Sequence, residues 1–119
     1  MAVVKIFGIK NCDTMKKAFK WLDAQGIDYD FHDYKKDGVD EAVLTQAIEQ
    51  YDWETVINKR GTTWRKLSDD VKDNMDAARA LEIAKENPSI VKRPLLDYSG
   101  ELVVGFNTDT YTTLIKRVA

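Results

Sequence analysis

Residues 3–26 read VVKIFGIKNCDTMKKAFKWLDAQG, a stretch that predicts a strand, a turn and a helix in succession. The opening apolar run has the length and the β-branched residues of a strand buried on both faces, and Gly8 closes it. Asn11–Thr14, which includes Cys12, is predicted to be the following turn. One face of a helix then carries Met15, Ala18, Phe19 and Leu22. Gly26 is suited to end that helix, because glycine adopts the left-handed backbone conformation easily.

A second strand is predicted directly after this helix. Ile27, Tyr29 and Phe31 alternate with polar residues, which is the period of a strand with one buried face. A strand, a helix and a strand in this order favour two parallel strands. His32, the only histidine of the chain, lies among aspartates here, and we interpret it as a surface or strand-edge residue rather than a catalyst.

The middle of the chain is predicted to be helical. Lys36–Gly38 has the composition of a turn. Asp40 and Asp76 each precede an apolar helical stripe and are suited to cap it, and Pro88 should end the second of these helices. We therefore expect a helical insertion over approximately residues 39–90.

The last third of the chain predicts a hairpin and a helix. Ser99 and Gly100 form a two-residue link between apolar runs, which is typical of a tight β-hairpin. An amphipathic helix follows, with Asn107 or Thr108 as its predicted cap. The expected order is βαβ, a helical insertion and ββα. We therefore predict an α/β fold with a thioredoxin- or glutaredoxin-like mixed sheet, in a single domain over residues 1–119.

Composition narrows the function classes. The chain has 119 residues and a net charge of −2, which argues against a general nucleic-acid binder. No secretory signal or membrane-spanning segment is expected, and the single cysteine excludes an internal disulfide, so we predict a cytoplasmic protein. No spacing of cysteine and histidine suggests a metal site, and we expect no bound cofactor.

Cys12 is the candidate nucleophile. The free N–H groups and the dipole at a helix N-terminus favour an anion, and a thiolate is the attacking form of a cysteine. Thr14 lies at this N-terminus, and Lys10 adds positive charge nearby, whereas Asp13 opposes it. The alternative interpretation is an inert cysteine that packs as a small hydrophobic residue.

Three motifs carry a family resemblance. They are Ile9-Lys10-Asn11-Cys12-Asp13-Thr14-Met15-Lys16-Lys17-Ala18, Asn58-Lys59-Arg60-Gly61-Thr62-Thr63-Trp64 and Val91-Lys92-Arg93-Pro94-Leu95-Leu96. Together with Gly105-Phe106 and the final helix, they resemble the arsenate reductase (ArsC) family over essentially the whole chain. The YffB-type branch is the most similar, and Spx-type transcriptional regulators are relatives.

The resemblance implies a glutaredoxin-like fold with an inserted helical subdomain, and it implies that Cys12 is the redox cysteine. Arg60 and Arg93 would then point toward the cysteine and stabilise its thiolate or an anionic substrate. Pro94 would be a cis-proline beside the site. Arginine suits this role because its planar fork of donors binds oxyanions and carboxylates.

Two departures from the family pattern bear on the activity. Glutathione-dependent arsenate reductases have a third arginine where this chain has Phe106-Asn107-Thr108. Spx-type regulators usually carry Cys-x-x-Cys, whereas Cys12 is followed three residues later by Met15. The arsenate site is therefore expected to be incomplete, and the usual regulatory disulfide cannot form.

The sequence leaves three functions open. The first is a glutathione-dependent thiol–disulfide reductase in which an external thiol resolves a mixed disulfide on Cys12, with an arsenate reductase proper as the narrower alternative. The second is an Spx-like binding module that docks on RNA polymerase, and the third is a domain with an inert cysteine. The partners expected for the first are glutathione or another small thiol, with glutaredoxin or an oxidised protein as further candidates. We expect a monomer that binds neither nucleic acid nor membranes.

Overall fold

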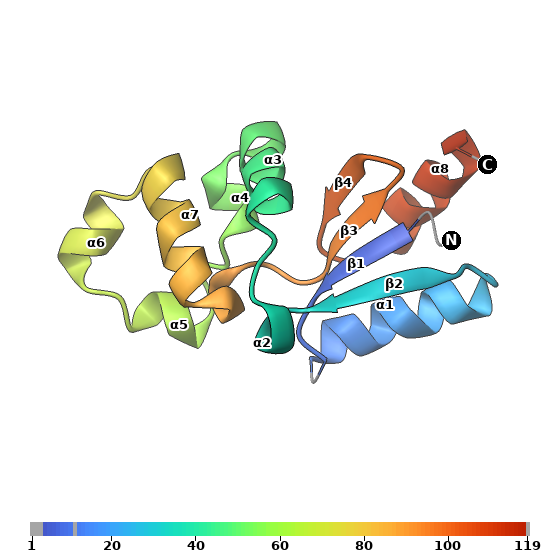
Figure 1. Cartoon of the computed structure of the whole chain (residues 1–119), viewed down its shortest axis with the longest axis horizontal. Helices are drawn as coiled ribbons and strands as arrows, with labels where there is room; N and C mark the ends of the chain where they lie inside the picture. Colours follow the sequence, from blue (N-terminus) through green and yellow to red (C-terminus); the bar gives the residue numbers. More distant parts are fainter. Residues whose placement is uncertain (1–3, 11, 119) are drawn as a thin grey trace. The chain divides into compact units, whose positions relative to one another are not determined.

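The computed structural model of the chain describes residues 4–10 and 12–118 (Figure 1). Its contacts divide the chain into two compact units. The sheet unit comprises residues 1–33 and 93–119, and the inserted unit comprises Tyr34–Lys92. The predicted helical insertion, residues 39–90, falls within the second of these. The organisation as a single domain stays a prediction.

Within its described residues, the sheet unit contains four strands and two helices. In chain order they are β1 (Val4–Gly8), α1 (Asp13–Ala24), β2 (Tyr29–Asp33), β3 (Leu95–Tyr98), β4 (Glu101–Val104) and α8 (Thr108–Val118). The strand order is β2-β1-β3-β4, with β1 parallel to β2 and antiparallel to β3. This mixed sheet, built from βαβ and ββα units, confirms the predicted thioredoxin-like fold class.

Helix α1 ends at Ala24, and Gly26 terminates it as predicted, with a φ of +68° just beyond the C-cap residue Gln25. The N–H of Gly26 donates to the Asp23 carbonyl, and the N–H of Ile27 donates to the Leu22 carbonyl at 3.0 Å. These two bonds form a Schellman motif, which satisfies carbonyls that the helix itself leaves free. Because Ile27 takes part in this cap, β2 begins at Tyr29, two residues later than the alternating pattern predicted.

The turn predicted at Asn11–Thr14 is wrong for its last two residues. Asp13 and Thr14 already belong to α1, and Cys12 is its N-cap residue, while Asn11 lies outside the described residues. The helix begins earlier because the Cys12 carbonyl accepts a hydrogen bond from the N–H of Lys16 at 3.0 Å. That bond is the first of the helical series.

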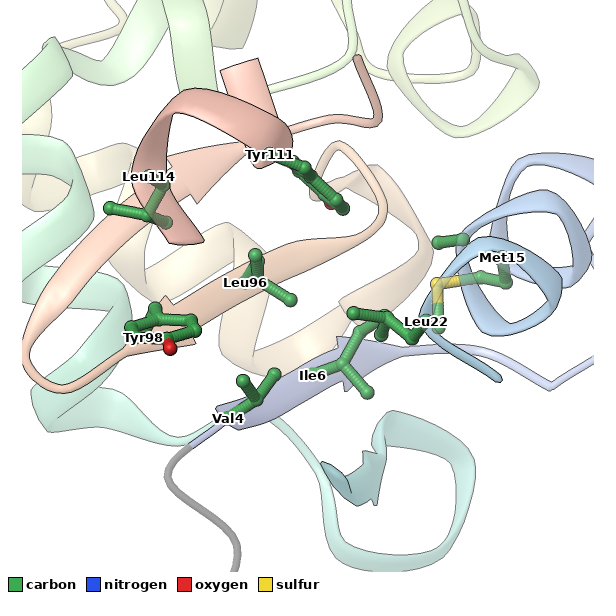
Figure 2. Packing of buried hydrophobic residues seen from close by; sticks show 9 residues of the cluster. Val4, Ile6, Met15, Leu22, Leu96, Tyr98, Tyr111 and Leu114 are labelled. Carbon is green, nitrogen blue, oxygen red and sulfur yellow. The ribbon is translucent and has the colours of Figure 1, made fainter. Parts of the chain in front are cut away.

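Both helices of the sheet unit contribute to one hydrophobic core (Figure 2). The buried residues of this cluster are Val4, Ile6, Met15, Ala18, Leu22, Leu96, Tyr98, Tyr111 and Leu114. Gly8 permits the close approach of α1 to β1, because a Cβ there would lie 2.5 Å from the Met15 sulfur. Full burial of a side chain such as Leu22 contributes about 1.5–3 kcal/mol. The core therefore fixes the first turn of α1 against the end of β1.

The C-terminal hairpin and helix form as predicted. Ser99 and Gly100 have positive φ values of 51° and 93°, as a two-residue hairpin turn requires. Helix α8 is capped by Asn107, whose side-chain oxygen accepts from the N–H of Thr110 at 3.0 Å. No helix in the part of the chain that the structure describes combines the length and the apolar character needed to cross a membrane.

The inserted unit consists of short helices. They are α2 (Tyr34–Asp37), α3 (Glu41–Tyr51), α4 (Trp53–Val56), α5 (Thr62–Arg65), α6 (Asp69–Asp73), α7 (Ala77–Glu86) and the 3-10 turn η1 (Pro88–Ile90). Asp40 caps α3 by accepting from the N–H of Val43 at 3.1 Å, and Asp76 caps α7 by accepting from the N–H of Arg79 at 2.8 Å. Both caps were predicted. Of the turn predicted at Lys36–Gly38, Lys36 and Asp37 are instead the last residues of α2, and Gly38 follows the helix with a φ of +72°.

Candidate functional site

The Cys12 sulfur lies at the N-terminus of α1. Cys12 has an extended backbone, with φ −135° and ψ 131°, and so directs the chain from the loop into the helix. Its side chain is half-buried and free of any disulfide. The first N–H groups of a helix have no partner within the helix, so this end carries partial positive charge. The position therefore favours a thiolate over a thiol.

The pKa of the Cys12 thiol is lower than that of an ordinary cysteine. Burial acts in the opposite direction and is the largest single influence, but it is outweighed by hydrogen bonds from the N–H groups of Met15 and Thr14 together with the hydrogen bond and charge of Arg93. The Cys12 side chain makes no capping hydrogen bond in the structure. The N–H groups of Thr14 and Met15 favour the thiolate because a thiol is a weak acceptor and a thiolate is a strong one.

Arg93 reaches Cys12 from the segment that precedes β3. Strand β1 pairs antiparallel with β3, with Phe7 opposite Leu95, so the residues before β3 lie beside the end of β1. The Arg93–Pro94 peptide bond is cis, as the resemblance implied, and Pro94 is buried. The structure thus brings Cys12 and Arg93 together in the sheet unit.

Arg60 belongs to the inserted unit, so its convergence on Cys12 stays a prediction. It is exposed, and its N–H donates to the side-chain oxygen of Asn58 at 3.1 Å. The Asn58 N–H donates in turn to the Ile90 carbonyl at 2.8 Å, which ties this loop to η1. Arg60 and Asn58 line a polar pocket of about 480 Å³ together with Glu54, Ile57, Lys59 and Lys92.

Lys59, the neighbour of Arg60, is held by an aromatic pair. The rings of Trp53 and Trp64 stack with centroids 6.1 Å apart, and the Lys59 ammonium lies 5.6 Å and 5.9 Å from the two centroids. It also pairs with Glu54 at 3.4 Å. Sequence reasoning did not find this cluster, because the spacing of Trp53, Lys59 and Trp64 shows no helical or strand period.

The remaining predicted site residues differ in their roles. Thr14 contributes its backbone N–H, whereas Lys10 has an exposed side chain. Met15 contributes a backbone N–H as well, which sequence reasoning missed because the residue was assigned to the core only. His32 lies on β2, at the edge of the sheet, with its ring 5.3 Å from that of Phe7.

Comparison with known proteins places this site in a family. The sequence profile of the ArsC family matches residues 7–114. The chain belongs to the ArsC family. It is 46% identical over 109 residues to an uncharacterized protein of Haemophilus influenzae, and the match covers 92% of this chain and 96% of that protein. It is 25% identical over 117 residues to the global transcriptional regulator Spx of Streptococcus agalactiae, which covers 97% of this chain and 85% of the regulator.

Solved structures of ArsC-family relatives share the fold. A protein named YffB superposes with a TM-score of 0.89 at 45% identity, covering 92% of this chain and 96% of its own. An arsenate reductase-related protein of Brucella melitensis has 52% identity and a TM-score of 0.74, covering 98% and 96%. Both structures agree with the membership of this chain in the ArsC family.

Proposed function

We propose that this ArsC-family protein is a thiol–disulfide reductase that uses Cys12 as its nucleophile and glutathione as its co-substrate. The observation that carries the proposal is the lowered pKa of Cys12 at the N-terminus of α1, beside Arg93. A lowered pKa increases the fraction of thiolate near neutral pH, and the thiolate is the form that attacks disulfides.

The reaction proceeds by two thiol–disulfide exchanges. The Cys12 thiolate attacks the glutathione sulfur of a protein–glutathione mixed disulfide, the S–S bond breaks, and the protein leaves as a thiolate that takes up a proton. Cys12 then carries glutathione. A second glutathione thiolate attacks this mixed disulfide, which releases oxidised glutathione and restores the Cys12 thiolate. The two electrons come from glutathione, because the chain has one cysteine and no internal resolving thiol.

Exposure to oxidised glutathione tests this proposal. The purified protein is incubated with oxidised glutathione and its intact mass is measured, then reduced glutathione is added. We expect the mass to rise by one glutathionyl group and to return on reduction. A protein that keeps its original mass over a range of pH would leave the glutathione proposal without support.

The relation to Spx favours one second candidate. Spx regulators match 97% of this chain, so a binding module that docks on RNA polymerase is consistent with the same fold. The regulators' usual Cys-x-x-Cys switch has no counterpart here, because Cys12 is the only cysteine. A pull-down of RNA polymerase subunits that is insensitive to Cys12→Ser would support this candidate over the reductase.

Arsenate reduction is expected to be weak or absent. The third arginine of the family pattern is replaced within Phe106–Thr108, and Asn107 is engaged as the cap of α8. The loss of one hydrogen bond from a cation to an oxyanion costs about 1.5–3 kcal/mol, or roughly a 10- to 100-fold lower rate. An assay coupled to NADPH oxidation, with excess glutathione and glutaredoxin, measures this rate. Turnover as fast as that of a true arsenate reductase would refute the prediction.

A further inference from the structure

Tyr111 is a fully buried tyrosine of the sheet unit whose hydroxyl has a specific partner. The hydroxyl donates to the Gly105 carbonyl at 2.8 Å, and none of the side chain is exposed. Burial raises the pKa of the Tyr111 phenol, so it is a neutral donor throughout the physiological range. A buried hydroxyl that donates to one fixed carbonyl restricts the position of that carbonyl.

Gly105 is held from its other side by Pro94. The N–H of Gly105 donates to the Pro94 carbonyl at 2.8 Å. Gly105 has a φ of +86°, a conformation that glycine adopts without the strain that a side chain would bring. The two hydrogen bonds thus form a continuous connection from the Tyr111 hydroxyl through Gly105 to Pro94, the residue next to Arg93.

The ring of Tyr111 also packs against α1, the helix that carries Cys12. It makes edge contacts with Trp21 on α1, at a centroid distance of 5.6 Å, and with Phe106, at 5.2 Å. The same side chain therefore contacts the Cys12 helix through its ring, and through its hydroxyl it contacts Gly105, whose N–H donates to the Pro94 carbonyl. Figure 2 shows Tyr111 in the core that also contains Met15 and Leu96.

We propose that Tyr111 is a positioning residue for the Cys12–Arg93 pair, which it holds in place through Gly105 and Pro94. The ring fixes how far α1 lies from Tyr111 on α8. The hydroxyl fixes, through Gly105 and Pro94, the segment just before β3 from which Arg93 reaches the sulfur. The inference rests on the proposed function only in taking the Cys12 thiolate as the reacting group. Among charged side chains, Arg93 acts on this thiolate from the segment before β3, whereas Asp13 on α1 and Lys10 on the loop are exposed.

The variant Tyr111→Phe tests the role of the hydroxyl, because it keeps the ring and removes the donor. The rate of Cys12 alkylation by iodoacetamide is measured against pH, with circular dichroism to confirm the fold. We expect the midpoint of the pH profile to rise by about 0.3 pH unit, a two-fold smaller thiolate fraction below the midpoint. The shift is smaller than for loss of Arg93, because the arginine remains nearby.

Tyr98→Phe is the matched control, since Tyr98 is a buried tyrosine of the same core that takes no part in the connection through Gly105 to Pro94. It should leave the midpoint unchanged. If Tyr111→Phe fails to fold, Gly105→Ala strains the same connection at a site with open space for a methyl group, and it should raise the midpoint too. An unchanged midpoint in the folded Tyr111 or Gly105 variant, or an equal shift in Tyr98→Phe, overturns the proposal. The readout needs no glutathione, so it is independent of the test of the proposed function.

Discussion

Replacement of Cys12 by serine is expected to abolish mixed-disulfide formation and all thiol reductase activity, while the fold is kept. Cys12 supplies the only sulfur that can form the disulfide, because the chain has one cysteine. Serine is also a preferred N-cap residue, and Cys12 holds the N-cap position of α1. The free energy of unfolding, measured by thermal unfolding, should therefore change by less than about 1 kcal/mol in either direction. Intact mass after treatment with oxidised glutathione measures the chemical effect.

Two outcomes would contradict this expectation. A gain of glutathionyl mass in Cys12→Ser would mean that glutathione attaches without Cys12. Retention of wild-type reductase activity by the variant would mean that the activity belongs to another group or to a contaminant. A loss of structure in the variant would be addressed with Cys12→Ala, which also removes the sulfur but adds no hydroxyl.

Arg93→Ala is expected to raise the pKa of Cys12 and to change the shape of its pH–rate profile. Loss of the arginine removes both a hydrogen bond and a positive charge that favour the thiolate, and a rise of about one pH unit follows. A more basic thiolate is also a better nucleophile, with a Brønsted coefficient of about 0.4–0.5. Well below the wild-type pKa, the thiolate fraction falls about ten-fold while each thiolate reacts about three-fold faster, so alkylation should be about three-fold slower than in the wild type. Above the pKa of the variant, where both proteins are thiolates, alkylation should be about three-fold faster.

Lysine and remote controls sharpen the test of Arg93. Arg93→Lys should recover part of the effect, because lysine supplies charge without the planar fork. Arg79→Ala, on the exposed surface of α7, should change nothing. Arg60→Ala should give the same kind of pH–rate profile as Arg93→Ala if Arg60 has the role that the resemblance to the ArsC family implies. A wild-type profile in Arg93→Ala would show that the guanidinium does not act on the sulfur.

The lowered pKa of Cys12 also couples ionisation to folding. The pKa of Cys12 in the folded protein lies below the ordinary thiol value of 9.0, which applies to the unfolded chain. Ionisation of Cys12 therefore stabilises the folded state most strongly above pH 9.0. This contribution declines as the pH falls toward the folded pKa and is absent below it. In Arg93→Ala the two pKa values move closer together, so the pH dependence of unfolding in alkaline solution should be weaker than in the wild type.

The elements whose apolar pattern repeats over several turns were predictable from the sequence. Helix α1 carries a stripe of three turns and a glycine at its end, and α3 and α7 each follow an aspartate that can cap them. The short helices of the inserted unit were not predicted, because four or five residues are too few to show a helical period. Their positions depend on packing within the unit.

The candidate site was predictable only in part. The location of Cys12 after an apolar strand and before an amphipathic stripe was sufficient to propose a reactive thiol. The contact with Arg93 could not follow from periodicity, because it depends on the antiparallel register in which Phe7 lies opposite Leu95. The resemblance to a family supplied that pairing. The connection from Tyr111 to Pro94 had no sequence signal, since it passes through backbone groups that any residue carries.

The insertion of one unit within the other has a consequence for synthesis on the ribosome. Strand β1 lies at the centre of the sheet, yet its antiparallel partner β3 is made only after the whole inserted unit, since Val4 pairs with Tyr98. In the nascent chain, Cys12 therefore emerges long before Arg93 and Tyr111. Until the last strands join, the thiol lacks Arg93, one of the groups that lower its pKa, although the N–H groups of Thr14 and Met15 are already in the chain. The share of the lowered pKa that depends on Arg93 is therefore acquired only late in synthesis.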